Sequence, residues 1–185
     1  MQPIVIHNRL VFGGLGVIFS LLFFALLAAV ADAAPTDDNF PAEFSLPVGH
    51  HALFSAPASG DEVFQCVATS AGYAWQLRGV DAKLLDVDGH LFATQNDVGS
   101  WLAIDGSSLS GNVTQSVGAA SGAFGAALYQ VTTKSPGGVF SQISEVIRDD
   151  VSGGQAPAQA CDQNSARTSV RVPFKADYIF FAPES

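Results

Sequence analysis

Apolar and polar side chains alternate over short runs from about residue 48 to the end of the chain. The runs are broken roughly every 8–12 residues by clusters of Gly, Asp, Ser or Pro, which are typical of turns between strands. Phe64, Cys66 and Ala68 fall on one face of such a run, and Trp75 and Leu77 fall on one face of the next. This period of two predicts β-strands with one buried face.

Two Asp-Gly pairs, Asp88-Gly89 and Asp105-Gly106, mark expected hairpins. An Asp-Gly pair between alternating runs is typical of a two-residue type I′ turn, because Gly accepts the positive φ that the turn demands. Such turns fix which residues face each other across the two strands. The expected cross-strand pairs are Leu85 with Phe92 and Leu102 with Leu109.

The chain from residue 116 onwards predicts three further strands, one of them over Leu128–Thr133, and two loops. Residues 168–181 alternate most regularly, and Pro173 within them indicates an edge position or a bulge, because proline cannot donate a ladder hydrogen bond. Residues 139–148 fit a helical stripe or a strand, and their β-branched content favours the strand. Residues 116–125, rich in Gly and Ser, and residues 149–161, with Asp, Gly and Pro, predict loops.

The pattern as a whole predicts an all-β domain over residues 48–182. Roughly nine or ten short strands without βαβ spacing indicate a single-domain β-sandwich, jelly roll or barrel. Residues 34–47 have no period and read as an extended lead-in.

Residues 10–30 form an apolar segment that follows Arg9. Ala31-Asp32-Ala33 is the small-x-small pattern that signal peptidases require, so residues 1–33 are expected to be a cleaved signal peptide. The alternative is an uncleaved membrane anchor, since the segment is long enough to span a bilayer. Either reading predicts an exported protein, secreted or periplasmic, whose only membrane contact is this segment.

The net charge and the cysteine content are consistent with export and limit the classes of partner. Residues 34–185 hold seven of the eight Lys and Arg residues and 16 of the 17 Asp and Glu residues. This acidic balance argues against a nucleic-acid partner. Cys66 and Cys161 are the only cysteines, and in an oxidising compartment they are expected to form a disulfide rather than remain two buried thiols.

A series of short motifs runs in order through most of the exported part. The motifs are Val63-Phe64-Gln65-Cys66 before Trp75, Ala82-Lys83-Leu84-Leu85-Asp86 with Gly89, Trp101 before Asp105-Gly106-Ser107, Ile147-Arg148 before Gly153-Gly154, Ala156-Pro157 and Cys161, and the closing Val172-Pro173-Phe174-Lys175-Ala176-Asp177-Tyr178. With these motifs the chain resembles the domain-of-unknown-function 3455 family of exported bacterial and fungal proteins.

Two segments depart from the pattern that the resemblance implies. Residues 95–100 lack the histidine-containing run expected before Trp101, and residues 127–129 lack an expected Pro-Trp. Some fungal relatives are labelled malate dehydrogenase. This chain has no Gly-x-Gly-x-x-Gly phosphate cradle and no alternating helices, so that activity is not expected and no cofactor is predicted.

Four residues are candidates for ligand binding. Trp101 and Tyr129 could offer flat apolar surfaces, although aromatic residues of small β domains are often core. His90 and Arg148 could supply polar contacts, and Arg148 is expected to make an ion pair or a carbonyl contact that organises the loop after it. His90 alternates with Asp86 and Asp88 as in a metal site, but Asp88 fits a turn former better, and no metal is predicted.

Catalytic motifs are weak. The nearest run to a Gly-x-Ser-x-Gly elbow, residues 119–123, has alanine at both glycine positions. We therefore expect a binding module for a small molecule, a glycan or an envelope component. The alternatives are a small hydrolase or oxidoreductase with a site built from distant loops, and a structural envelope or surface protein.

Overall fold

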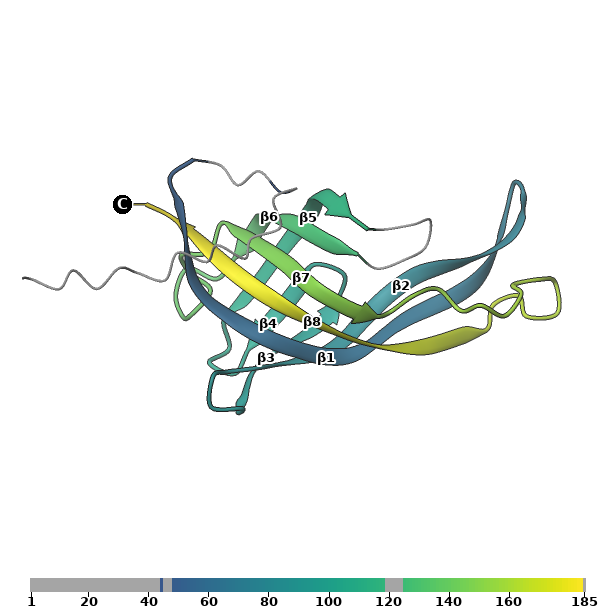
Figure 1. Ribbon diagram of the computed structural model, residues 1–185, viewed down its shortest axis with the longest axis horizontal. Helices are drawn as coiled ribbons and strands as arrows, with labels where there is room; N and C mark the ends of the chain where they lie inside the picture. Colours follow the sequence, from purple (N-terminus) through teal and green to yellow (C-terminus); the bar gives the residue numbers. More distant parts are fainter. Residues whose placement is uncertain (1–43, 45–47, 119–124, 185) are drawn as a thin grey trace, which may run out of the picture. The chain divides into compact units, whose positions relative to one another are not determined.

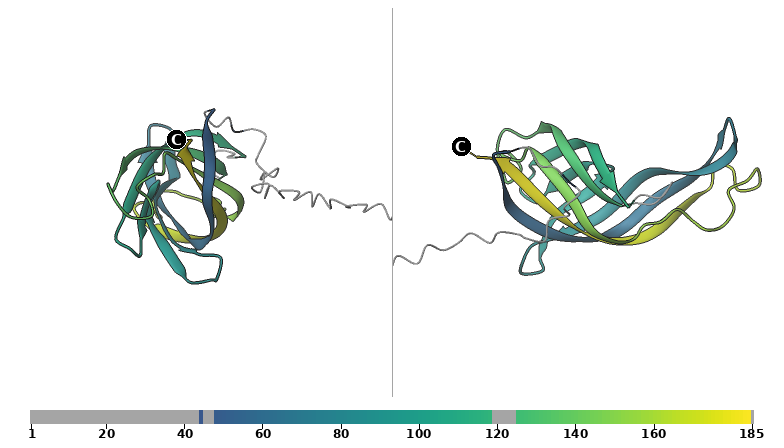
Figure 2. Two further views of the ribbon diagram at one scale, coloured as in Figure 1. Left: turned by 90° about the vertical axis from the view of Figure 1, so that its left-hand side faces the viewer. Right: turned by 45° about the horizontal axis from the view of Figure 1, so that its top comes forward.

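Eight antiparallel strands close into one barrel in the computed structural model, which describes Phe44, residues 48–118 and residues 125–184 (Figure 1). Each strand pairs with its neighbour in sequence, and β1 pairs with β8 to close the ring, which is seen from one side in the left view of Figure 2. The strands are β1 (His50–Thr69), β2 (Gly72–Leu85), β3 (Leu91–Asp97), β4 (Ser100–Ala103), β5 (Ser108–Val117), β6 (Ala126–Lys134), β7 (Glu145–Gly153) and β8 (Ser169–Pro183).

The all-β prediction is confirmed, and the barrel is the observed form of the three that were open. The strands within the described residues number eight rather than nine or ten, because some are longer than expected. β1 runs unbroken for 20 residues through Gly60, which looks like a turn residue in the sequence. A Cβ on Gly60 would lie 2.1 Å from the Asp81 carbonyl oxygen, so this glycine permits close approach of β1 and β2.

Both Asp-Gly turns occur, each with one more residue than expected. Gly89 N–H donates to the Asp86 carbonyl, and Gly106 N–H donates to the Ala103 carbonyl. In each turn the glycine alone has positive φ, whereas a type I′ turn needs two such residues. The extra residue shifts the register by one. The observed pairs are Leu85 with Leu91 and Trp101 with Leu109, so the expected pairs of Leu85 with Phe92 and Leu102 with Leu109 were wrong.

β1, β2 and β8 continue past the barrel as a three-stranded arm (Figures 1 and 2). β2 pairs with β1 up to Thr69–Gly72, whereas its pairing with β3 begins at Ala82. The predicted disulfide is confirmed: it joins Cys66 of β1 to Cys161 in the segment before β8. Trp75 Nε1–H donates to the Gln159 carbonyl at 2.9 Å, so this segment is also hydrogen-bonded to β2.

Four phenylalanines pack in the apolar part of the barrel. The Phe54 and Phe180 ring centroids are 4.8 Å apart, and those of Phe140 and Phe180 are 5.4 Å apart. Phe92 meets Phe140 edge-on at 5.8 Å. Phe140 lies in a turn rather than in the strand expected over residues 139–148, because that strand begins only at Glu145.

The outer face of the barrel carries a smaller apolar cluster. Phe44, the described residue of the expected lead-in, is buried there against Leu128, Ile147 and Phe181. The rest of the expected lead-in and the whole expected signal segment, residues 1–33, lie outside the described residues. Within the described part of the chain, no helix has the length and apolar character to cross a membrane. The disulfide is compatible with an exported protein.

Candidate functional site

Six polar or amphipathic side chains point into the barrel, one from each of six strands. Each belongs to a residue that is at most 4% exposed. We call them the interior polar cluster: Glu62 of β1, Gln95 of β3, Trp101 of β4, Tyr129 of β6, Arg148 of β7 and Tyr178 of β8. Most barrel interiors of this size are filled with apolar side chains, so this concentration of polar groups is the principal candidate site.

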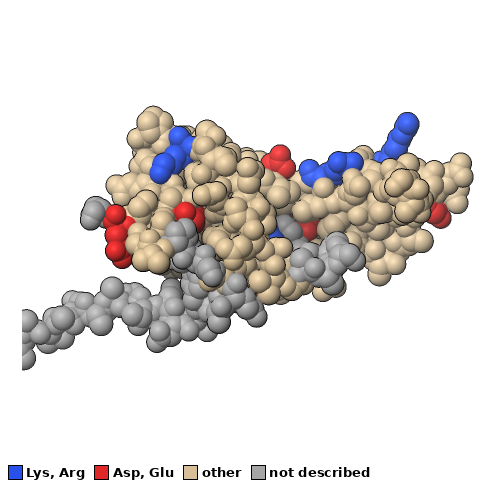
Figure 3. All heavy atoms as spheres, turned by 90° about the horizontal axis from the view of Figure 1, so that it is seen from above, with Lys and Arg blue, Asp and Glu red and all other residues tan. Residues whose placement is uncertain are grey.

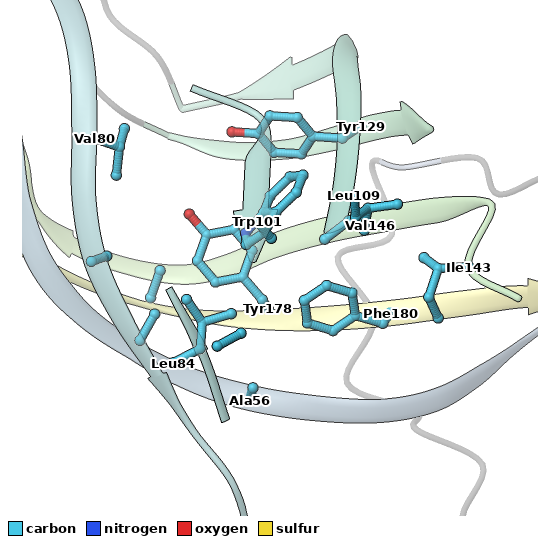
Figure 4. Packing of buried hydrophobic residues seen from close by; sticks show 14 of the residues in the cluster. Ala56, Val80, Leu84, Trp101, Leu109, Tyr129, Ile143, Val146, Tyr178 and Phe180 are labelled. Carbon is cyan, nitrogen blue, oxygen red and sulfur yellow. The ribbon is translucent and has the colours of Figure 1, made fainter. Parts of the chain in front are cut away.

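Two short hydrogen bonds tie the cluster together. Arg148 Nη1–H donates to Tyr129 Oη at 2.6 Å, and Tyr178 Oη–H donates to Gln95 Oε1 at 2.6 Å. The Trp101 ring lies edge-on to both tyrosines, with centroid distances of 5.2 Å to Tyr129 and 5.7 Å to Tyr178. In Figure 4 both tyrosine hydroxyls point toward Val80, near where β2 leaves the barrel for the arm, and Phe180 and Ile143 lie at the opposite end.

Four buried polar atoms of the cluster have no hydrogen-bond partner in the part of the chain that the structure describes. They are both carboxyl oxygens of Glu62, Nε2 of Gln95 and Nε1 of Trp101. A buried polar atom without a partner costs about 1–3 kcal/mol, so folded proteins keep few of them. Four within one barrel interior set this region apart as the candidate site.

Glu62 lies where the barrel meets the arm. Burial raises the pKa of its carboxyl from 4.5 to about 8, and the positive charge of Arg148 opposes part of that rise. The carboxyl is therefore mostly protonated at neutral pH. Gly154, directly after β7, packs against it: a Cβ on Gly154 would lie 3.2 Å from both Cδ and Oε1 of Glu62.

The structure brings three of the four predicted binding residues together. Trp101, Tyr129 and Arg148 are all members of the interior polar cluster. Arg148 donates from Nε and Nη2 to the Gly125 carbonyl at 3.0 and 2.6 Å, and Gly125 precedes β6 rather than lying in the segment that follows Arg148, where the contact was expected. His90 lies elsewhere, on the exposed turn between β2 and β3. A binding role for these residues stays a prediction.

Sequence reasoning missed Glu62, Gln95 and Tyr178 as site residues. Glu62 has the same parity along β1 as Phe64 and Cys66, so a charged residue stood on an otherwise apolar face, and that signal could have revealed it. In the sequence, Gln95 stands out only as the first residue of the segment 95–100, which departs from the pattern of the resembling family. Its role in the interior depends on pairing with Trp101 across β3 and β4, which the sequence does not specify.

The Asp86, Asp88 and His90 side chains do meet, with potential ligand atoms within 4.8 Å of one another. Asp86 Oδ1 accepts hydrogen bonds from the backbone N–H groups of Asp88 at 3.0 Å and His90 at 2.8 Å. The backbone hydrogen bond from His90 is the main reason that the pKa of Asp86 lies below its usual value. These contacts hold the turn, and they account for the position of the aspartate without a metal.

A serine, a glutamate and a histidine also meet near the start of β1 and β7. Ser144 Oγ donates to Glu145 Oε2, and His50 Nε2 lies 2.9 Å from the same oxygen. The carboxylate stands between the other two groups, so these contacts do not pair a serine nucleophile with a histidine base. They do not form the arrangement that a serine hydrolase needs.

The arm–barrel junction also bears a surface groove of about 390 Å³, lined in part by Arg78, Asp81 and Arg171. Arg171 donates to Asp61 and Asp81, so its charge is balanced by two carboxylates. In Figure 3 charged groups of both signs are spread over the face in view, with uncharged surface between them.

Comparison with known proteins gives one family. The family model described as a protein of unknown function (DUF3455) matches residues 86–182, more than half of the chain. The match includes five members of the interior polar cluster and leaves out Glu62. No curated protein and no solved structure matches the chain significantly. The chain therefore belongs to the DUF3455 family, whose function is unknown.

Proposed function

We propose that this protein is an exported binding module that holds a small molecule at the interior polar cluster. The observation that carries the proposal is the set of four buried polar atoms, on Glu62, Gln95 and Trp101, that lack protein partners. A ligand that bonds to them would recover the desolvation cost of leaving these atoms unpartnered. Small-molecule sites typically combine an apolar lining with a few placed polar groups, as this barrel does.

Export is the second part of the proposal. The apolar segment of residues 10–30, the Ala-x-Ala pattern after it and the Cys66–Cys161 disulfide support it together. In an extracellular or periplasmic space, a closed barrel with a disulfide-tied arm suits a carrier or sensor that must keep its shape without cytosolic chaperones.

The test is the mass of the protein recovered from the exported compartment of its own host. We expect the native mass to exceed the denatured mass by a defined small-molecule increment. The denatured mass also reports cleavage after Ala33. Trp101→Phe removes one unpartnered donor and should lower the fraction of protein that carries the increment. Trp75→Phe is the matched control, because the Trp75 N–H is already bonded to Gln159.

Two results contradict the proposal. The first is equal native and denatured masses, which means that no tightly held molecule is present. The second is an increment that Trp101→Phe and Trp75→Phe leave equally occupied, which places the bound molecule away from the barrel interior.

A further inference from the structure

Two of the four unpartnered atoms of the cluster are nitrogen donors, Trp101 Nε1 and Gln95 Nε2, and the other two are the carboxyl oxygens of Glu62. Trp101 Nε1–H can only donate. The Gln95 amide is oriented by the Tyr178 hydroxyl, which donates to Oε1 and leaves the Nε2 donors unpartnered. Gln95 and Trp101 are direct cross-strand partners, so their side chains are neighbours on the inner face of the sheet. Two strands thus present neighbouring donors without an acceptor.

Glu62 supplies both a donor and an acceptor beside them. With a pKa of about 8, its carboxyl carries a proton at neutral pH and offers one O–H donor beside one carbonyl acceptor. The charged or titratable groups that act on it are Arg148 from β7, Tyr129 from β6 and Tyr178 from β8. Burial raises the pKa of both tyrosines above 10, so they stay neutral beside it.

The apolar surroundings limit the remainder of the ligand. The rings of Trp101, Tyr129 and Tyr178 lie together in the barrel, and Phe180 lies on their Ile143 side (Figure 4). A glycan presents many hydroxyl donors, each of which needs an acceptor when buried, and among the unpartnered atoms only the Glu62 carboxyl offers one. The excess of donors favours a compact molecule that is rich in acceptors and otherwise apolar.

We infer that the ligand is a small carbonyl compound, such as a ketone, an ester or a lactone, whose oxygen accepts hydrogen bonds from Trp101 Nε1 and Gln95 Nε2. Glu62 supplies a further donor at the same site. This inference rests on the proposed function and gives it a ligand class.

Nuclear magnetic resonance can test the inference directly, because the protein has two tryptophans and hence two indole N–H signals. The oxidised protein is titrated with cyclohexanone, which only accepts hydrogen bonds, and with cyclohexylammonium, which only donates them. We expect cyclohexanone to shift the Trp101 indole and Gln95 side-chain amide signals and to leave the Trp75 indole signal in place. Cyclohexylammonium should bind more weakly.

Two variants separate hydrogen bonding from simple apolar contact. Trp101→Phe keeps an aromatic ring and loses the donor, so the Kd for cyclohexanone, followed on Gln95, should rise about tenfold. Trp75→Phe should leave the Kd unchanged. Glu62→Gln keeps a donor at every pH. Between pH 6.5 and pH 9 the Kd of the unmodified protein should therefore rise about tenfold, because only the protonated carboxyl donates, while that of Glu62→Gln stays constant.

The inference is overturned by equal or tighter binding of cyclohexylammonium, or by an unchanged Kd in Trp101→Phe. It is also overturned if the Trp101 indole N–H contacts only internal water and its signal does not shift when cyclohexanone is added. If cyclohexanone fails while the native mass shows an increment, the ligand class is wrong and the proposed function stands. If both fail, the proposed function falls as well.

Discussion

At the scale of single residues, the interior is organised around the protonation of Glu62. Burial favours the neutral carboxyl, and Arg148 favours the charged one, with burial the stronger effect. The carboxyl therefore binds a proton more tightly in the folded protein than in the unfolded chain. This difference couples folding to pH in a range where ordinary carboxylates have finished titrating.

The stability contributed by Glu62 should fall as pH rises. Because its folded pKa of about 8 exceeds the unfolded value of 4.5, the contribution is complete below pH 4.5 and is lost as pH rises to about 8. The total is at most about 5 kcal/mol. Urea unfolding at pH 5.5 and pH 9 should show Glu62→Gln gaining stability relative to the unmodified protein at the higher pH. Asp88→Asn, on an exposed turn, serves as the control.

An unchanged difference between Glu62→Gln and the unmodified protein at the two pH values would contradict this reading of the carboxyl. It would mean that Glu62 ionises in the folded protein much as it does in the unfolded chain.

Gly154→Ala should destabilise the protein more than Gly89→Ala does. Both glycines have positive φ, +67° and +81°, so both variants bear a left-handed backbone cost of roughly 1–2 kcal/mol. Only at Gly154 does the new methyl group press on Glu62 and Phe174, whereas Gly89 has open space. Crowding should add about 1–3 kcal/mol at Gly154. Urea denaturation of the two variants measures it, and equal losses would contradict the packing of Gly154 on Glu62.

At the scale of elements, the barrel and the arm depend on different interactions. The barrel has a continuous core, whereas the arm is three strands and a covering segment joined by the disulfide and by hydrogen bonds such as Cys66 N–H to the Thr168 carbonyl. Elements with less core behind them open more readily. The disulfide closes a sequence separation of 95 residues and constrains the unfolded chain as well.

Replacing both cysteines by alanine should loosen the arm before the barrel. Hydrogen exchange at the backbone N–H of residue 66 should be much faster in the variant, which has alanine there, than in the native protein. The same comparison at Ala103 N–H, which donates to Ser107 within the barrel, should show a far smaller acceleration. Overall stability should fall by up to about 4–5 kcal/mol from the lost chain constraint. Equal acceleration at both amides would show that arm and barrel open as one unit.

Alternation along the sequence predicted the elements better than it predicted their register. A period of two identifies strands, and two cysteines in an exported chain indicate a disulfide, so both predictions were confirmed. The two Asp-Gly turns differ from a type I′ turn by one residue, and an Asp-Gly pair alone does not separate the two forms. Gly60 misleads in the opposite direction. It looks like a break in the strand, but it lies within β1 and permits the close approach of β2.

At the scale of the whole molecule, the candidate site exists because the barrel closes. Pairing of β1 with β8, from His50–Pro183 to Gln65–Ser169, brings Glu62 into one interior with residues far along the chain. Trp101, Tyr129 and Arg148 could be proposed from the sequence because aromatic and cationic residues in β domains often bind ligands. The sequence could not predict that these residues lie beside Glu62 and Gln95, because their proximity depends on strand order and register.

The central claim is that a small molecule satisfies the unpartnered atoms of the interior polar cluster. A high-resolution crystal structure of the protein recovered from its own exported compartment tests it most directly. The account predicts density for a non-water molecule within hydrogen-bonding distance of Trp101 Nε1 and Gln95 Nε2, next to the Glu62 carboxyl. Density for isolated waters alone, or side chains repacked so that these atoms bond to one another, would contradict it.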